Sequence, residues 1–231
     1  MDLFLVPNNP EHTVLVSLNG VAHYQVTTGK IDKSGRRVSK LQRPAESEED
    51  SLIAEIEWKT WEQPAVLRSS LLTRGIPSVE CDASLNRRIV KNDGRNQASG
   101  GGRAVGVLAT EFLYKRTRFS STRYFLGDDE VEYRWKIVKG VGCVLTNGET
   151  DEEIARFSSM ATDEGLYAGE RKSRLRIQPC SVDIDLVVLS FLMMEKKRRA
   201  KAGDKALVMG NAHDEDPQGE GDAGDGGGGG Q

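Results

Sequence analysis

The sequence predicts a mainly β, β-rich α+β domain in which a closed antiparallel β-barrel surrounds one central hydrophobic C-terminal helix. Three observations support this fold class. Short segments with the alternating apolar pattern of strands, separated by turn residues, fill most of residues 3–180. Residues 182–202 are apolar on every face when drawn as a helix. No linker-like composition divides the 231 residues in the middle, so we expect one domain.

The strand segments are expected to pair as a meander of hairpins. Asn19-Gly20 and Asn147-Gly148 each lie between two strand-like segments, and such dipeptides tolerate the positive φ angles of tight turns. A third hairpin brackets residues 127–130. The expected strands are residues 13–16, 21–26, 52–58, 123–126, 131–137, 142–145, 154–157 and 175–177.

Three segments are expected to carry no regular structure. Residues 42–51 contain Pro44 and several acids and predict a solvated loop. A flexible insertion is expected at about residues 92–106; its glycine-rich end lacks the Lys-Ser/Thr of a phosphate-binding loop. Residues 203–231 are rich in Gly, Asp and Glu, and cannot bury enough apolar surface to offset the entropy of ordering. We therefore expect a domain at residues 1–202 and a disordered acidic tail at 203–231.

The helix expected at residues 182–202 has polar ends that suit its dipole. Ser181 is the expected N-cap, and Asp183 and Asp185 lie in the first turn, where negative charge is favoured. A basic run at residues 196–201 lies near the other end, and it also resembles a nuclear localisation cluster. The β-branched pair Val187-Val188 leaves a central strand open as the alternative.

Composition indicates a cytoplasmic or nuclear protein. The three cysteines are far apart and odd in number, which argues against a disulfide framework and suits a reducing compartment. The N-terminus lacks the basic start of a signal peptide, and the longest apolar run, residues 186–194, is too short to cross a bilayer. Residues 204–231 hold seven of the 35 acids and one of the 32 bases, which leaves residues 1–203 with about three net positive charges. This weak excess is compatible with an anionic partner.

Several segments together resemble a known family. They are Pro7 to Pro10, the hairpin with Gly20 and Tyr24, Ile56-Glu57-Trp58, Tyr133 to Lys136, Ala155-Arg156-Phe157 and residues 182–199. In this order they are similar to an uncharacterised family of small proteins from mushroom-forming fungi, known as a domain of unknown function. That family in turn resembles the tubby C-terminal domain, the LURP-one-related plant proteins and the phospholipid scramblases. The resemblance implies a barrel of roughly twelve strands threaded by a hydrophobic helix, and it brings no catalytic residues.

The chain contains no recognisable catalytic or metal-binding motif, so we expect no enzyme, no cofactor and no metal site. His213 lies in the tail, while His23 reads as a surface residue of a strand. Cys143 and Cys180 are expected to be buried packing residues. The acids at 128–130 and 151–153 coincide with turns and read as solvated turn residues, although they could bind a hard cation weakly. An enzyme of unrecognised type is the weakest of three hypotheses.

Three groups of basic residues give the functional signal. They are Lys115, Arg116, Arg118 and Arg123, next to three aromatic residues, then Arg171, Lys172, Arg174 and Arg176, and the run at residues 196–201. If the barrel brought two of these groups together, they would form a patch for anionic phospholipid, by analogy with tubby-like proteins. Contact with nucleic acid is disfavoured, and an ordinary solvated face is the plain alternative. The other functional hypothesis is a protein–protein interaction or scaffold domain with a variable acidic tail.

Overall fold

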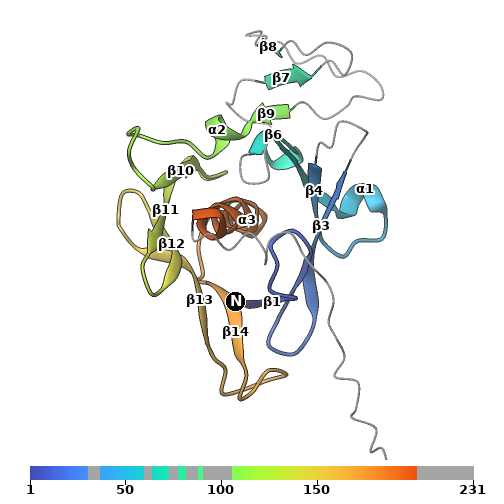
Figure 1. Cartoon of the computed structure of the whole chain (residues 1–231), viewed down its shortest axis with the longest axis vertical. Helices are drawn as coiled ribbons and strands as arrows, with labels where there is room; N and C mark the ends of the chain where they lie inside the picture. The colour runs from blue at the N-terminus through green and yellow to red at the C-terminus, as the bar shows by residue number, and fades with distance from the viewer. Residues whose placement is uncertain (31–36, 60–63, 73–77, 82–87, 91–105, 202–231) are drawn as a thin grey trace, which may run out of the picture.

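The computed structural model describes residues 1–30, 37–59, 64–72, 78–81, 88–90 and 106–201 of the chain. The insertion expected at residues 92–106, apart from Gly106, and the tail expected at 203–231 lie outside the described residues. The described part is mainly β, as the sequence predicts, and its strands form one antiparallel sheet (Figure 1).

The strands follow one another along the sheet almost in chain order. They are β1 (Asp2–Val6), β2 (Thr13–Val16), β3 (Ala22–Lys30), β4 (Arg37–Gln42), β5 (Leu52–Trp58), β6 (Pro64–Ser69), β7 (Ser78–Cys81), β8 (Arg88–Val90), β9 (Gly106–Leu108), β10 (Arg123–Leu126), β11 (Glu132–Val138), β12 (Gly142–Asn147), β13 (Glu153–Ala161) and β14 (Arg171–Ile177). The order across the 14-stranded sheet of the described residues is β10-β11-β12-β13-β14-β1-β2-β3-β4-β5-β6-β9-β7-β8. The pairing of β14 with β1 joins the two halves of the chain.

The three predicted hairpins are present. β10 pairs with β11, β2 pairs with β3, and Gly20 has the positive φ, 82°, that its turn requires. β12 pairs with β13, but there the positive φ lies at Asp151, at 60°, and not at Gly148. The reason is a longer turn, in which the carbonyl of Asn147 accepts a hydrogen bond from the backbone N–H of Asp151 at 3.2 Å.

Six strands, β1, β4, β6, β7, β8 and β9, are not among those expected from the sequence. β4 pairs on both sides, with β3 and with β5, so its ladder partners supply the order that its polar sequence does not predict. The loop expected at residues 42–51 is shorter than predicted, because α1 (Glu48–Ser51) occupies its end. The hydroxyl of Ser47 caps this single turn by accepting a hydrogen bond from the N–H of Asp50 at 3.1 Å.

The predicted C-terminal helix is α3 (Ile184–Lys201), which excludes the alternative of a central strand. Its cap differs from the prediction. Asp183, not Ser181, accepts the N–H of Asp185 at 2.8 Å, whereas the Ser181 hydroxyl donates to Asp129 at 2.5 Å. A carboxylate next to the first helical residue satisfies an N–H that the helix itself leaves open.

α3 is buried over most of its length. Its apolar side chains from Leu186 to Met194 are between 0% and 3% exposed, and they belong to the hydrophobic core. In Figure 1 strands lie on several sides of α3. Segments far apart along the chain supply side chains that contact it. Among these contacts are Asn8 with Arg199, Tyr24 with Asp185, Trp58 with Lys196, Trp135 with Ser190 and Phe157 with Phe191.

The expectation of a closed barrel is wrong for the described residues. β10 and β8 are the ends of the sheet, and no described strand pair joins them. The physical reason lies at β10, where the N–H and the carbonyl of Tyr124 are both taken by Tyr114, at 2.9 Å each. The chain between β9 and β10 also forms α2 (Ala109–Phe112), which contacts β6, β9 and β10. A short helix and an isolated bridge therefore lie next to β10, an end strand that a closed barrel would need to pair with a further strand.

Candidate functional site

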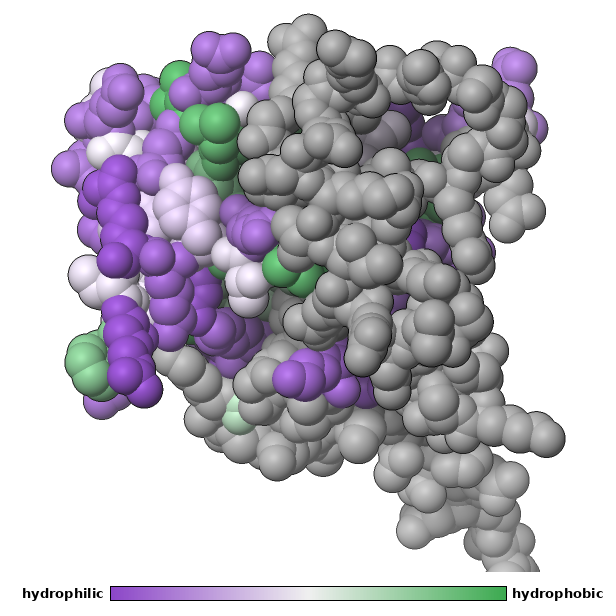
Figure 2. Space-filling view, turned by 90° about the horizontal axis from the view of Figure 1, so that it is seen from above, coloured by the Kyte–Doolittle hydropathy of each residue, from purple (hydrophilic) through white to green (hydrophobic). Residues whose placement is uncertain are grey.

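The candidate site is a loop of residues 115–123, which we call the basic loop. The bridge between Tyr114 and Tyr124 joins its two ends, and their rings stack with centroids 6.0 Å apart. α2 precedes the loop and β10 follows it, so both ends are tied to the fold. In Figure 1, α2 and β10 lie toward the top of the view and β14 toward the bottom. Figure 2, which views the molecule from that upper side, shows that the described part of this face is mainly hydrophilic, with separate hydrophobic residues within it.

An exposed aromatic ring stands among the cations of the basic loop. Phe119 is 94% exposed, although a phenylalanine ring normally finds apolar neighbours in a folded domain. Arg118 and Lys115 are also exposed, and the Lys115 Nζ donates to the carbonyl of Arg118 at 3.1 Å. The loop therefore presents an exposed apolar ring directly after three exposed cations in the sequence.

The Arg116 side chain contacts residues at the base of the basic loop. Its guanidinium lies 4.8 Å from the centroid of the Tyr124 ring and forms an ion pair with Glu132, while its side chain remains 62% exposed. Glu132 also accepts the hydroxyl of Tyr114. Burial and this hydrogen bond raise the pKa of Tyr114 to about 12, so the phenol keeps its proton at neutral pH.

Arg123 differs from the other predicted residues of this group because it is only 6% exposed. Its guanidinium donates to the carbonyls of Ser120 and Thr122 at 3.2 and 3.0 Å, and burial lowers its pKa. Arg123 therefore shapes the loop from inside, and the surface charge comes from Lys115, Arg116 and Arg118.

The second predicted group lies on β14 and is not brought next to the first. Three strands separate β14 from β10, which at about 4.8 Å per strand places the groups roughly 19 Å apart along the sheet. Asp2 pairs with Arg174 at 3.7 Å and with Arg176 at 3.2 Å. Lys172 pairs with Glu170 at 2.8 Å, and Arg171 donates to the carbonyl of Ser159 at 3.4 Å. Each of these four cations therefore has an acceptor on β1, on β13 or directly before β14.

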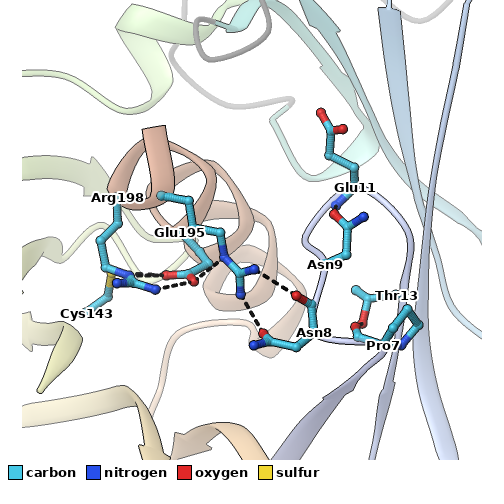
Figure 3. Close-up of polar contacts among 9 residues, drawn as sticks. Pro7, Asn8, Asn9, Glu11, Thr13, Cys143, Glu195 and Arg198 are labelled. Atoms are coloured by element: carbon cyan, nitrogen blue, oxygen red, sulfur yellow. Dashed lines mark hydrogen bonds and ion pairs between the residues drawn. The ribbon is translucent and has the colours of Figure 1, made fainter. Parts of the chain in front are cut away.

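The basic run at the end of α3 is largely internal. Glu195 is 0% exposed and accepts hydrogen bonds from Arg198 and from Arg199, the latter at 2.7 Å (Figure 3). Arg199 is 2% exposed and also donates to Asn8, at 2.7 Å to the backbone carbonyl. The interpretation as an accessible localisation signal therefore fails for Arg199, whose charge faces the loop between β1 and β2.

Lys196 is the second buried cation of this run, at 1% exposure. Its Nζ lies 2.5 Å from Glu11 Oε1 and 3.4 Å from the centroid of the Trp58 ring. Glu11 also pairs with Arg37. Burial outweighs the attraction to Glu11 and lowers the pKa of Lys196 to about 8. The sequence alone could not reveal this cluster, since its residues are far apart along the chain.

Two of the acids considered as weak cation ligands, Asp128 and Asp129, accept hydrogen bonds within the fold. Asp128 accepts the N–H of Asp183 at 2.9 Å just before α3, and Asp129 accepts the hydroxyls of Tyr133 and Ser181. Burial acts to raise the pKa of Asp129, but these hydrogen bonds outweigh it and lower the pKa. Asp129 is therefore not the freely solvated turn acid expected from the sequence, whereas Asp128, Glu130, Asp151 and Glu152 are exposed.

The other groups considered for chemistry are held in unreactive surroundings. Cys143 is buried, and burial raises the pKa of its thiol, as it does for the half-buried Cys180.

Within the described ranges, no group of three or more His, Cys, Asp or Glu residues is placed to hold a metal ion. None of the helices in the described part is both long enough and apolar enough to span a membrane. A shallow hollow of about 530 Å³ is lined by Met1, Asp2, Ser17, Leu18, Asn19, Gly165 and Leu166.

Comparison with known proteins gives a family and a distant structure. The family described as "Family of unknown function (DUF6593)" matches residues 8–200. No curated protein matches the chain. An X-ray structure of a protein from Arabidopsis thaliana is similar over 86% of this chain and 91% of that chain, with 12% sequence identity and a TM-score of 0.31.

Proposed function

Because the chain belongs to the family of unknown function DUF6593, we propose a function from its own residues: it is a non-enzymatic binding module whose basic loop attaches it to membranes that contain anionic phospholipid. One observation carries this proposal. Phe119, at 94% exposure, follows three exposed cations in a loop whose two ends are joined by the Tyr114–Tyr124 bridge. An aromatic ring can enter the interface of a bilayer while neighbouring cations contact lipid phosphates.

The anchoring of the loop favours this use. A flexible loop loses conformational entropy when it binds, whereas the Tyr114–Tyr124 bridge and the buried Arg123 already restrict residues 115–123. Each cation near an anionic surface contributes about 1 kcal/mol, and interfacial burial of a phenylalanine about 2 kcal/mol. Such terms sum to reversible, salt-sensitive binding.

The proposal also covers the fold family, the location of the protein in the cell and the scaffold hypothesis. We place the domain among tubby-like proteins of fungal origin. We also place α3 at the centre of the sheet, and contacts to α3 from the β1–β2 loop, β3, β5, β11 and β13 support that position of the helix. A cytoplasmic or nuclear location agrees with the negative potential of the cytoplasmic leaflet. The scaffold hypothesis depends on residues 203–231, which lie outside the described residues.

The test is co-sedimentation of the full chain with vesicles. Vesicles of phosphatidylcholine alone are compared with vesicles that also contain about one quarter phosphatidylserine or a few per cent phosphoinositide, at physiological salt. We expect enrichment on the anionic vesicles and a fall of about fivefold in the binding constant for Arg118→Ala, from the loss of about 1 kcal/mol. Phe119→Ala should weaken binding by tenfold or more, from about 2 kcal/mol.

The matched control is Arg176→Ala, which removes the same charge from β14, where Asp2 pairs with it at 3.2 Å. We expect this variant to bind like the parent. If the parent binds neutral vesicles equally well, or if Arg176→Ala and Arg118→Ala weaken binding alike, the basic loop is not the membrane site.

A further inference from the structure

The basic loop contains a hydroxyl at a position that its arginines define. Ser121 follows Arg118 by three residues and Arg116 by five. We propose that Ser121 is a phosphorylation site for a protein kinase that recognises arginine three and five residues before the acceptor, and that the phosphate releases the domain from anionic membranes. The phosphorylation site is argued from the loop alone, whereas the release from membranes rests on the proposed function.

The groups that such a kinase must contact are accessible together. Ser121 and Arg118 are exposed, and the Arg116 side chain is 62% exposed. Kinases that select arginine before the acceptor do so with carboxylates, which pair with the guanidinium through two parallel hydrogen bonds. The ion pair of Arg116 with Glu132 lies at this exposed surface, so exchanging it for an enzyme carboxylate costs little.

The structure distinguishes Ser121 from the hydroxyls on either side of it. Ser120 is half-buried, and its Oγ accepts the N–H of Thr122 at 3.0 Å. Thr122 is also half-buried, and its carbonyl accepts a hydrogen bond from Arg123. Modification of either neighbour would disturb the contacts that shape the loop. Of these three side chains, only that of Ser121 is exposed.

The segment before Ser121 can also adopt the extended form that a kinase cleft requires. The hydrogen bonds that shape it are local: Ser120 N–H reaches Thr117 O at 3.3 Å, and Lys115 Nζ reaches Arg118 O at 3.1 Å. Such exposed, local bonds open at a small fraction of the cost of global unfolding. The Tyr114–Tyr124 bridge can meanwhile keep β10 in the sheet.

The transfer uses ATP with Mg²⁺ as the co-substrate. The Ser121 oxygen attacks the γ-phosphorus, the bond from that phosphorus to the β–γ bridging oxygen breaks, and ADP leaves. The hydroxyl proton passes to the catalytic aspartate of the kinase. The product is a phosphomonoester with about 1.5 to 2 negative charges at neutral pH.

This charge would lie within the loop that is proposed to meet the membrane. It opposes the cations at residues 115, 116 and 118, whose attraction to anionic lipid is about 1 kcal/mol each. Offsetting two such charges corresponds to a fall of about 30-fold in the binding constant. Repulsion between the phosphate and lipid phosphates acts in the same direction.

The experiment treats the full chain with a kinase of this arginine-directed class and Mg-ATP, and maps the phosphate by mass spectrometry. We expect phosphate on Ser121, none at this position in Ser121→Ala, and a rate at least tenfold lower in Arg118→Gln. A peptide of residues 112–124 serves as a substrate without the fold. Phosphate on Ser120 or Thr122 instead, or modification of the peptide but not of the chain, would overturn the site.

The second measurement compares vesicle binding of the phosphorylated chain and of Ser121→Ala treated in the same way. We expect about 30-fold weaker binding to anionic vesicles for the phosphorylated chain and unchanged binding for the variant. Equal binding overturns the release mechanism. If the unmodified chain does not bind vesicles, the proposed function and the release mechanism fail together, whereas the mass-spectrometric result decides the site independently.

Discussion

The end of α3 and the basic loop are similar in sequence and opposite in environment. Both are dense runs of lysine and arginine. In α3, Lys196 and Arg199 are 1% and 2% exposed and face the carboxylates of Glu11 and Glu195, which are themselves buried. In the basic loop, Arg118 is exposed beside a phenylalanine that is 94% exposed.

The difference teaches that a basic run has no fixed role. A buried cation is tolerated only where a carboxylate and further acceptors replace the water that it loses. The β1–β2 loop supplies Glu11 and Asn8 at the end of α3, whereas Glu132 is engaged by Arg116 and Tyr114 at the base of the basic loop. Charge in the first region therefore serves the fold, and charge in the second is available for a partner.

The largest expected effect is that of a charge placed in the middle of α3. Leu189 is 0% exposed, so Leu189→Asp buries an unpaired carboxylate at a cost of several kcal/mol, comparable with the whole stability of a domain. We expect no cooperative thermal transition by circular dichroism. Phe119→Asp, at a site 94% exposed, is the matched control and should keep the parental transition. A cooperative transition near the parental temperature in Leu189→Asp would show that α3 is not interior.

The next effect concerns the buried ion pairs. Glu195→Gln removes the charge that faces Arg199 and Arg198, and we expect a loss of about 3 kcal/mol, because a buried cation is left uncompensated. Urea unfolding monitored by tryptophan fluorescence measures this. Glu149→Gln, on an exposed turn, should change the free energy of unfolding by less than about 0.5 kcal/mol. Equal effects of the two substitutions would show that the buried ion pairs of Glu195 contribute no more to stability than an exposed carboxylate does.

The third prediction concerns how the contribution of Lys196 to the free energy of unfolding depends on pH. The pKa of Lys196 is about 8 in the folded protein and 10.5 ordinarily, so between these values the unfolded chain holds a proton that the folded chain has released. Stability attributable to Lys196 therefore rises with pH in this window. Relative to Lys196→Met, the parent should gain about 2 to 3 kcal/mol between pH 7 and pH 10.

Urea titrations of both proteins at pH 7, 8, 9 and 10 measure this difference. The tyrosines with raised pKa values, Tyr24, Tyr114 and Tyr133, are present in both proteins, so their contributions cancel. A constant difference between parent and variant over this range would mean that Lys196 titrates at its ordinary value.

The smallest expected effect is that of the basic loop on stability. Arg118→Ala should change the free energy of unfolding by less than about 0.5 kcal/mol, because its side chain is exposed and lies outside the core. The same variant is expected to bind anionic vesicles about fivefold more weakly. A loss of several kcal/mol on urea unfolding would instead give Arg118 a structural role and remove the contrast with Arg199.

The sequence by itself determined the features that depend on local pattern. Asn19-Gly20 predicts a hairpin from backbone preference alone, and the run from Leu186 to Met194 predicts a buried helix because it has no polar face. Both are present. The cations of the basic loop were also identified from sequence, although the full exposure of Phe119 was not.

Tertiary structure decided everything that joins distant residues. The sheet ends at β10, where Tyr114 and not a further strand pairs with Tyr124. This pairing depends on how the chain before β10 packs against the sheet. Likewise only packing brings Glu11, Trp58 and Lys196 together, and the burial that results lowers the pKa of the lysine. Burial and pairing are properties of neighbours, and the neighbours of a residue are set by packing rather than by its own segment.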